Sequence, residues 1–166
     1  MFNPSATESL ARERVRDRMR KADRADAVHR EVATALAYAP LFSQCSKREL
    51  RLVAKVAKTK NVRTGVVLTV EGEQGDSMFV LLSGHAVVRK GGKKIADLRA
   101  GDVVGELALL ARAPRNATVT TTSQSEVATI GRRDLGRLLE EAPGFSKKLL
   151  EALAMRIRDL DKRVVG

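Results

Sequence analysis

The chain has 166 residues, enough for one domain with flanking helices, and an apolar content of 43%, enough for a hydrophobic core. Aromatic residues make up only 3%, so the core is expected to be aliphatic. No apolar run reaches membrane-spanning length, the N-terminus shows no signal-peptide segment, and the single Cys45 excludes an internal disulfide framework. These features predict a cytoplasmic protein without a membrane span.

The net charge of +11 attracts anions of every kind, but it does not by itself indicate nucleic-acid binding. Residues 1–36 carry eight basic and six acidic side chains, a mixture typical of an exposed helix. No helix-turn-helix pattern follows the β-rich region, and no aromatic residues alternate with the basic ones as stacking platforms. We therefore expect no nucleic-acid partner. A DNA- or membrane-binding basic surface is kept as an alternative, and steep salt dependence of binding would reveal it.

The first part of the chain predicts helices. Apolar residues recur at helical spacing over 8–38 without Gly or Pro, so we assign 1–38 to a charged N-terminal helical extension. Pro40 ends this helix. Ser46 and Glu49 then predict a capping box for a second helix within a helical entry at 39–59. The long helix packs on its own domain or on a second copy, or it transmits a signal.

From residue 60 to residue 131, short β-branched runs alternate with Gly-rich turns. The clearest expected strands are 77–83, 85–90, 95–98, 117–122 and 127–130. The last two are expected to pair with each other. Many short strands at regular spacing predict an antiparallel sheet that closes or forms a sandwich.

Residues 132–166 predict helices again. One helix begins near Asp134, the Pro143–Gly144 pair interrupts it, and the last helix runs from about Ser146. An apolar stripe marks one face of the last helix: Phe145, Leu149, Leu153, Ile157, Leu160 and Val164. Such a stripe packs against the domain or against a second chain.

The stretch 105–119 has the features of an anion-binding loop. Gly105 allows a sharp turn, and 106–110 is long enough for one helical turn whose first N–H groups suit a phosphate. Arg115 is a permanent cation that can bind two oxygens at once. Because a carboxylate would repel a phosphate, Glu106 is expected to accept a hydrogen bond from a sugar hydroxyl. Each residue alone is ordinary for a turn or a surface, and the spacing gives the specificity.

This stretch closely resembles the phosphate-binding cassette of the cyclic nucleotide-binding domain family, which runs Phe-Gly-Glu, Ala-Leu-Leu and Arg-x-Ala. The matching residues are Gly105, Glu106, Leu107, Ala108, Leu109, Leu110, Pro114, Arg115, Ala117 and Val119. Val104 departs from the family's Phe, which alters packing and not the phosphate chemistry. Residues 40–42 and 49–50 also resemble the family's helical entry. The resemblance therefore implies a binding domain at 39–166, with a β-roll at 60–131 and C-terminal helices at 132–166.

The implied fold is α+β: an antiparallel β-roll of the jelly-roll type with N-terminal helices, a short cassette helix and C-terminal lid helices. The implied phosphate-binding residues are Gly105, Glu106, Leu107, Ala108, Arg115, Asn116 and Ala117. Ribose is implied at Gly105 and Glu106. The implied base contacts are Val88, Ala96, Leu98 and Asn116, of which the apolar ones are also explained as ordinary sheet core. The lid candidates on the last helix are Arg156, Ile157 and Leu160.

The implied ligand is cAMP or cGMP. In the family, Thr or Ser after the cassette arginine tends to favour guanine, but Asn116 stands here and can bond either base. We expect cAMP, since adenine needs fewer polar contacts. No cofactor or metal is expected, because a cyclic phosphate needs no magnesium ion and the two histidines, His29 and His85, form no cluster.

These observations predict a regulatory sensor and not an enzyme. Ligand binding would close the last helix and move the N-terminal helices, with a second copy or an effector protein bound through the terminal helices. The chain is alternatively the regulatory part of a larger channel, kinase or transferase, although the absence of sequence after Gly166 argues against a receptor-type transcription factor. A third reading is an oligomerisation scaffold that no longer binds nucleotide, which the intact Glu106 and Arg115 oppose.

Overall fold

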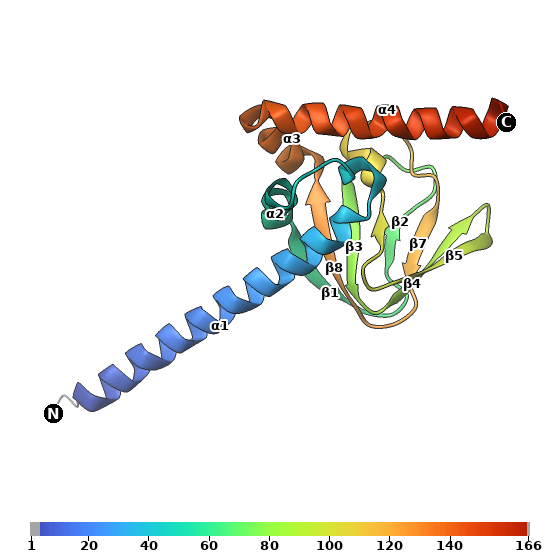
Figure 1. Cartoon of the computed structure of the whole chain (residues 1–166). Coiled ribbons are helices and arrows are strands. Elements are labelled where there is room, and N and C mark those ends of the chain that lie inside the picture. Colours follow the sequence, from blue (N-terminus) through green and yellow to red (C-terminus); the bar gives the residue numbers. More distant parts are fainter. Residues whose placement is uncertain (1–3, 166) are drawn as a thin grey trace.

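The computed structural model describes residues 4–165, which form a β-roll flanked by helices (Figure 1). The helices are α1 (Pro4–Ala37), η1 (Pro40–Phe42), α2 (Lys47–Lys55), η2 (Glu106–Leu109), α3 (Arg132–Glu141) and α4 (Pro143–Val165). The strands are β1 (Lys58–Val62), β2 (Val67–Thr69), β3 (Ser77–Ser83), β4 (His85–Lys90), β5 (Lys93–Arg99), β6 (Val103–Val104), β7 (Thr118–Thr121) and β8 (Ser125–Gly131). The expected α+β class with an antiparallel β-roll is confirmed.

Within this part of the chain, the strands form two four-stranded antiparallel sheets, with the orders β1-β8-β3-β6 and β2-β7-β4-β5. The predicted pairing of 117–122 with 127–130 is wrong. β7 pairs with β2 and β4, whereas β8 pairs with β1 and β3. The short link between them carries the chain from one sheet to the other, as in sandwiches that join their sheets by such crossings.

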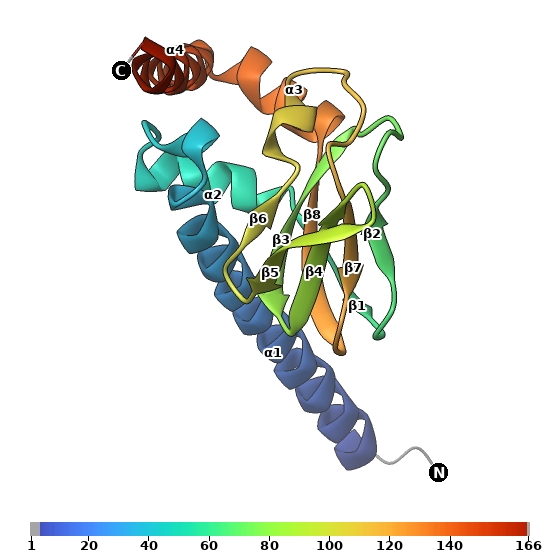
Figure 2. The ribbon, with the colours of Figure 1, turned by 90° about the vertical axis from the view of Figure 1, so that its right-hand side faces the viewer.

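Two apolar clusters hold these layers together. The smaller cluster lies between the two sheets and contains Val62, Leu81, Ala86, Val119 and Val127. The larger one joins the outer face of the first sheet to the helices and contains fully buried residues such as Leu36, Phe42, Met78, Ile130 and Leu135. Figure 2 shows the helices gathered on one side of the sheets. Burial of apolar surface stabilises a fold by roughly 25 cal/mol per Å². The larger cluster therefore holds the helices against the first sheet, next to the cassette.

α1 consists of an exposed part and a buried part. Its N-terminal turns project away from the body, and residues 5–26 are exposed (Figure 1). Its last turns enter the larger apolar cluster through Val32, Ala35 and Leu36. The helix begins at Pro4, earlier than the predicted residue 8, and proline is accepted there because the first turn needs no backbone donor.

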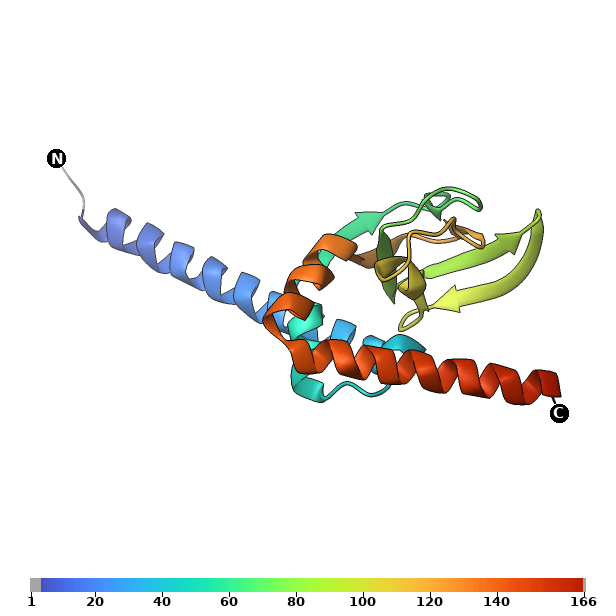
Figure 3. The same ribbon diagram turned by 90° about the horizontal axis from the view of Figure 1, so that it is seen from above.

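α4 lies across the top of the molecule and runs beyond the helical layer (Figures 1 and 3). It begins at Pro143 and not near Ser146, because proline favours the first helical position and the break falls at Ala142. The predicted stripe is buried only at its start. Phe145 and Leu149 are 2% exposed, whereas Ile157 is 61% exposed. The side chains of Leu160 and Val164 lie outside the described residues.

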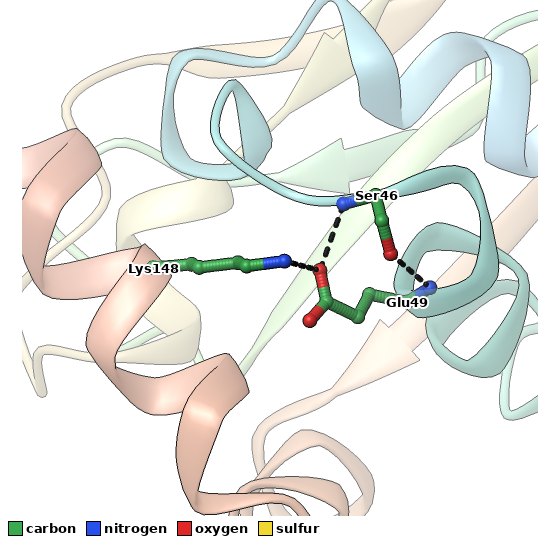
Figure 4. A network of polar contacts seen from close by, with 3 residues as sticks. All are labelled: Ser46, Glu49 and Lys148. Atoms are coloured by element: carbon green, nitrogen blue, oxygen red, sulfur yellow. Dashed lines mark hydrogen bonds and ion pairs between the residues drawn. The ribbon is translucent and has the colours of Figure 1, made fainter.

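The predicted capping box of α2 is present and has a distant partner (Figure 4). The Ser46 backbone N–H donates to Glu49 Oε2 at 2.7 Å, and the Glu49 backbone N–H donates to Ser46 Oγ at 3.2 Å. Lys148 Nζ of α4 lies 2.8 Å from the same Glu49 oxygen. The capping box thus links α2 to α4 as well as starting its own helix.

Candidate functional site

One cavity of about 620 Å³ is bounded by the cassette, strands of both sheets, the end of α1 and a single residue of α4. Its walls include most of the predicted site residues: Val88, Gly105, Glu106, Leu107, Ala108, Arg115, Asn116, Ala117 and Arg156. The structure therefore brings together residues that lie far apart in the chain. A cavity of this size is in the range that holds small organic ligands.

The cassette starts with a sharp turn at Gly105, as predicted. Its φ of 77° is left-handed, a conformation that residues with a Cβ rarely adopt. The following turn, η2, is a 3-10 helix and not an α-helical one. The Ala108 N–H donates to Gly105 O at 3.1 Å, while Ala108 and Leu109 are buried beneath it. Burial of this small apolar face fixes the turn at the cavity wall.

Arg115 lines the cavity, and its two terminal nitrogens differ in their hydrogen bonding. Its Nη2 donates to Ser77 O at 2.7 Å. Its Nη1 is buried and has no hydrogen-bond partner within residues 4–165. A buried charged donor without a partner is costly, by about 1–3 kcal/mol or more. The arrangement therefore favours binding of an anion at Nη1.

Two glycines leave the space that this guanidinium occupies. A Cβ at Gly75 would collide with Arg115 Nε, and a Cβ at Gly105 would collide with Nη1. The guanidinium carbon also lies 5.7 Å from the centre of the Phe79 ring, a cation–π distance. Burial lowers the pKa of Arg115 and the Asp76 carboxylate opposes that shift, but an arginine stays charged at any working pH.

Glu106, the expected ribose ligand, is paired with the last helix. Arg156 Nη1 of α4 lies 2.6 Å from Glu106 Oε1, and the Glu106 side chain is only 14% exposed. A carboxylate has two oxygens and several lone pairs, so this ion pair leaves Glu106 able to accept a further hydrogen bond. Arg156 therefore reaches the cavity directly.

Three other predicted residues, Ala96, Leu98 and Ile157, are not among those that line the cavity. Ala96 is exposed on β5 opposite Val88, and Leu98 is half-buried against the cluster between the sheets. Ile157 is exposed and does not belong to the cavity lining. The Leu160 side chain lies outside the described residues.

Several residues of the site were not found from the sequence. Ser77 accepts the Arg115 hydrogen bond, and Gly75 makes room for the guanidinium. Tyr38, at the end of α1, is 85% exposed and lines the cavity. The sequence offers one signal for these residues, the Gly75–Asp76 turn directly before a strand. That turn does not indicate which side chain packs against the glycine.

Among the residues that the structure describes, no group of three or more His, Cys, Asp or Glu is arranged to hold a metal ion. In the same range, no helix is both long and apolar enough to cross a membrane.

Comparison with known families agrees with the geometry. The family model described as "Cyclic nucleotide-binding domain" matches residues 59–142, which cover the β-roll, the cassette and α3. The chain belongs to the cyclic nucleotide-binding domain family. The predicted resemblance is thereby confirmed, and Gly105, Glu106 and Arg115 all lie inside the matched region.

Curated relatives include kinase regulators of both nucleotide types. The chain is 36% identical over 109 residues to a cAMP-dependent protein kinase regulatory subunit of Hypocrea atroviridis, covering 66% of this chain and 24% of that protein. It is 36% identical over 104 residues to a cGMP-dependent protein kinase of Toxoplasma gondii, covering 63% of this chain and 10% of that protein. The chain thus spans a quarter or less of these two relatives.

A solved structure shows the same fold. The N-terminal domain of a transcriptional regulator from Streptomyces coelicolor A3(2) matches with a TM-score of 0.71 and 25% identity. The match covers 77% of this chain and 95% of that one, so it includes helices as well as the β-roll.

Proposed function

We propose that this cyclic nucleotide-binding domain binds a cyclic nucleotide, preferentially cAMP, in the cavity beside η2 and acts as a regulatory sensor. The observation that carries the proposal is the buried, unpaired Nη1 of Arg115 within the cassette. A cyclic phosphate has one negative charge and two exocyclic oxygens, and one of them would satisfy Nη1. Charge-assisted bonds of this kind contribute about 1.5–3 kcal/mol each.

The same segment would also bind the ribose. Glu106 is the first residue of η2 and lines the cavity. Its carboxylate accepts from Arg156 through Oε1, and its remaining lone pairs suit a sugar hydroxyl. The phosphate and ribose contacts therefore come from one short segment of chain.

Support for the base preference comes from the cavity wall. Val88 and Val119 line the cavity and supply apolar surface for a purine, and Asn116 is one of its polar lining residues. An Asn lacks the hydroxyl with which Thr or Ser favours guanine in the family. One of the two kinase relatives is named as cAMP-dependent and the other as cGMP-dependent, so they do not decide which nucleotide this chain prefers.

Both terminal helical regions contribute residues to the cavity wall, and we expect both to respond to the ligand. Arg156 joins α4 to Glu106, and Ala35 and Tyr38 of the α1 region line the same cavity. A ligand that binds one arrangement of these helices more tightly shifts the population toward it. An effector protein or a second copy that contacts the terminal helices would receive this shift, without catalysis or a cofactor in this domain.

Calorimetric titration of cAMP and of cGMP into the purified chain tests the proposal. Arg115→Ala is expected to weaken binding by about tenfold or more, since it removes a charge-assisted bond. Arg112→Ala is the matched control because Arg112 is an exposed arginine on the same loop. Absence of both heat and a ligand-induced thermal shift with either nucleotide would overturn the proposal.

A further inference from the structure

Arg132, the first residue of α3, lies behind the cassette and bonds to its backbone. Its Nε and Nη2 donate to Ala108 O at 3.1 and 2.7 Å. The same Nη2 lies 3.2 Å from Ala111 O and 3.0 Å from Gly75 O. The backbone N–H of Arg132 donates to Asp76 O at 2.8 Å. One residue therefore holds two separate loops.

These two loops are the walls around the Arg115 guanidinium. The first is η2, whose Gly105 faces Arg115 Nη1, and the second is the turn whose Gly75 faces Arg115 Nε. The second loop also leads into Ser77, which accepts the Arg115 hydrogen bond. The spacing between the loops decides where the guanidinium points, because both glycines are in close contact with it.

We infer that Arg132 is a positioning residue for phosphate binding: it fixes the distance between these walls and so sets where the Arg115 guanidinium lies at the cavity wall. The inference rests on the proposed function. Arg132 itself bonds backbone carbonyls and acts through Arg115. A planar guanidinium with five donors reaches all three carbonyls, whereas a lysine ammonium on a flexible chain does not hold the same geometry.

The test compares Arg132→Gln and Arg132→Lys with the matched control Arg133→Gln. Arg133 is the exposed neighbour, so its replacement removes the same charge one position away. Affinity is measured by titration with cAMP and with its two phosphorothioate diastereomers, in each of which sulfur replaces one exocyclic oxygen. In parallel, the Arg115 Nε–Hε resonance is recorded by NMR in the nucleotide-free chain, with thermal melts to check folding.

We expect Arg132→Gln to weaken cAMP binding by about tenfold, the value of one lost charge-assisted bond. Arg132→Lys is expected to weaken it by less. The preference between the two diastereomers narrows in both variants, because a misplaced guanidinium no longer distinguishes the two oxygens, and the Arg115 resonance shifts or broadens. Arg133→Gln matches the wild type in every measurement.

An unchanged diastereomer preference together with an unchanged Arg115 resonance in folded Arg132→Lys would overturn the inference, even if affinity fell. If Arg132→Gln does not fold, Arg132→Lys decides the outcome alone. Failure of the wild-type chain to bind either nucleotide would instead contradict the proposed function. The Arg115 resonance would still report whether Arg132 positions that side chain.

Discussion

Arg156 Nη1 and Glu106 Oε1 lie 2.6 Å apart and join the second half of α4 to the start of the cassette. The two residues are 50 positions apart in the chain. Glu106 is the proposed ribose ligand, so the carboxylate that is expected to accept the ribose hydroxyl also holds the helix that is expected to move. On the proposed function, this ion pair would couple the position of α4 to a ligand in the cavity.

Replacing Arg156 with Ala tests this link. We expect cAMP affinity to fall by about two- to fivefold, because a partly exposed ion pair contributes up to about 1 kcal/mol. We also expect faster amide hydrogen exchange in α4 around residue 156, measured by mass spectrometry. Arg158→Ala is the control, since Arg158 is exposed on the same helix. Equal exchange rates in the two variants would show that the pair does not restrain the helix.

Replacing Gly75 with Ala tests the space that Arg115 occupies. The added Cβ would collide with Arg115 Nε, and the flexible guanidinium would move out of its bond to Ser77. We expect a folded protein whose cAMP affinity is at least about tenfold lower, since a charge-assisted bond is misplaced. Circular dichroism checks that the variant is folded, and calorimetry measures its affinity for cAMP.

Gly136→Ala is the matched control for that substitution. A Cβ at Gly136, within α3, meets no atom within 4 Å, and alanine favours a helix. This control is expected to bind normally and to melt at a slightly higher temperature. If Gly75→Ala binds cAMP as tightly as the wild type, then cAMP binding does not depend on the observed position of Arg115.

The sequence predicts the parts of this molecule that depend on neighbouring residues. The capping box needs only the spacing of Ser46 and Glu49, and it is confirmed. The turn at Gly105 needs only its missing Cβ and the apolar residues after it. Strand positions follow in the same way from local β-branched runs, which predict an antiparallel sheet that closes or forms a sandwich. The β-roll itself is implied by the family resemblance, and it is confirmed.

What the sequence does not predict depends on distant partners. β7 and β8 look like a hairpin because they are consecutive, but sheet membership is decided by pairing with β4 and β3. Arg132 looks like a surface charge beside Arg133, and only the fold places it on the cassette carbonyls. The contact of Lys148 with Glu49 spans 99 positions and has no local signal.

The thiol of Cys45 is expected to react slowly. Burial raises its pKa to about 11, with the Glu49 carboxylate adding to the shift and Lys148 opposing it. Against the ordinary value of 9.0, the thiolate fraction at pH 8 falls by about 100-fold, and the thiolate is the nucleophile. Iodoacetamide labelling followed by mass spectrometry should therefore be about 100-fold slower in the folded chain than in 8 M urea. Equal labelling rates in the folded chain and in urea would contradict the raised pKa of the Cys45 thiol.

Acid is expected to weaken the junction of α2 with α4. Burial would raise the pKa of Glu49, but the hydrogen bonds from Lys148 and Ser46 outweigh burial and hold that pKa below its ordinary value. Because the folded pKa is the lower one, the unfolded chain binds more protons and stability rises with pH. The contribution of Glu49 is full above the unfolded value of about 4.5 and is lost as the pH falls through the folded pKa.

Urea unfolding of the wild type and of Glu49→Gln between pH 7 and pH 3 measures this contribution. The variant should unfold at lower urea than the wild type at pH 7, and the two midpoints should converge as the pH falls below the folded pKa of Glu49, where that carboxyl is protonated in both states. Lys148→Ala should reproduce part of the loss at pH 7, whereas Lys147→Ala, which changes the exposed neighbouring lysine, should not. A gap between wild type and Glu49→Gln that is independent of pH would show that the carboxylate charge is not what joins α2 to α4.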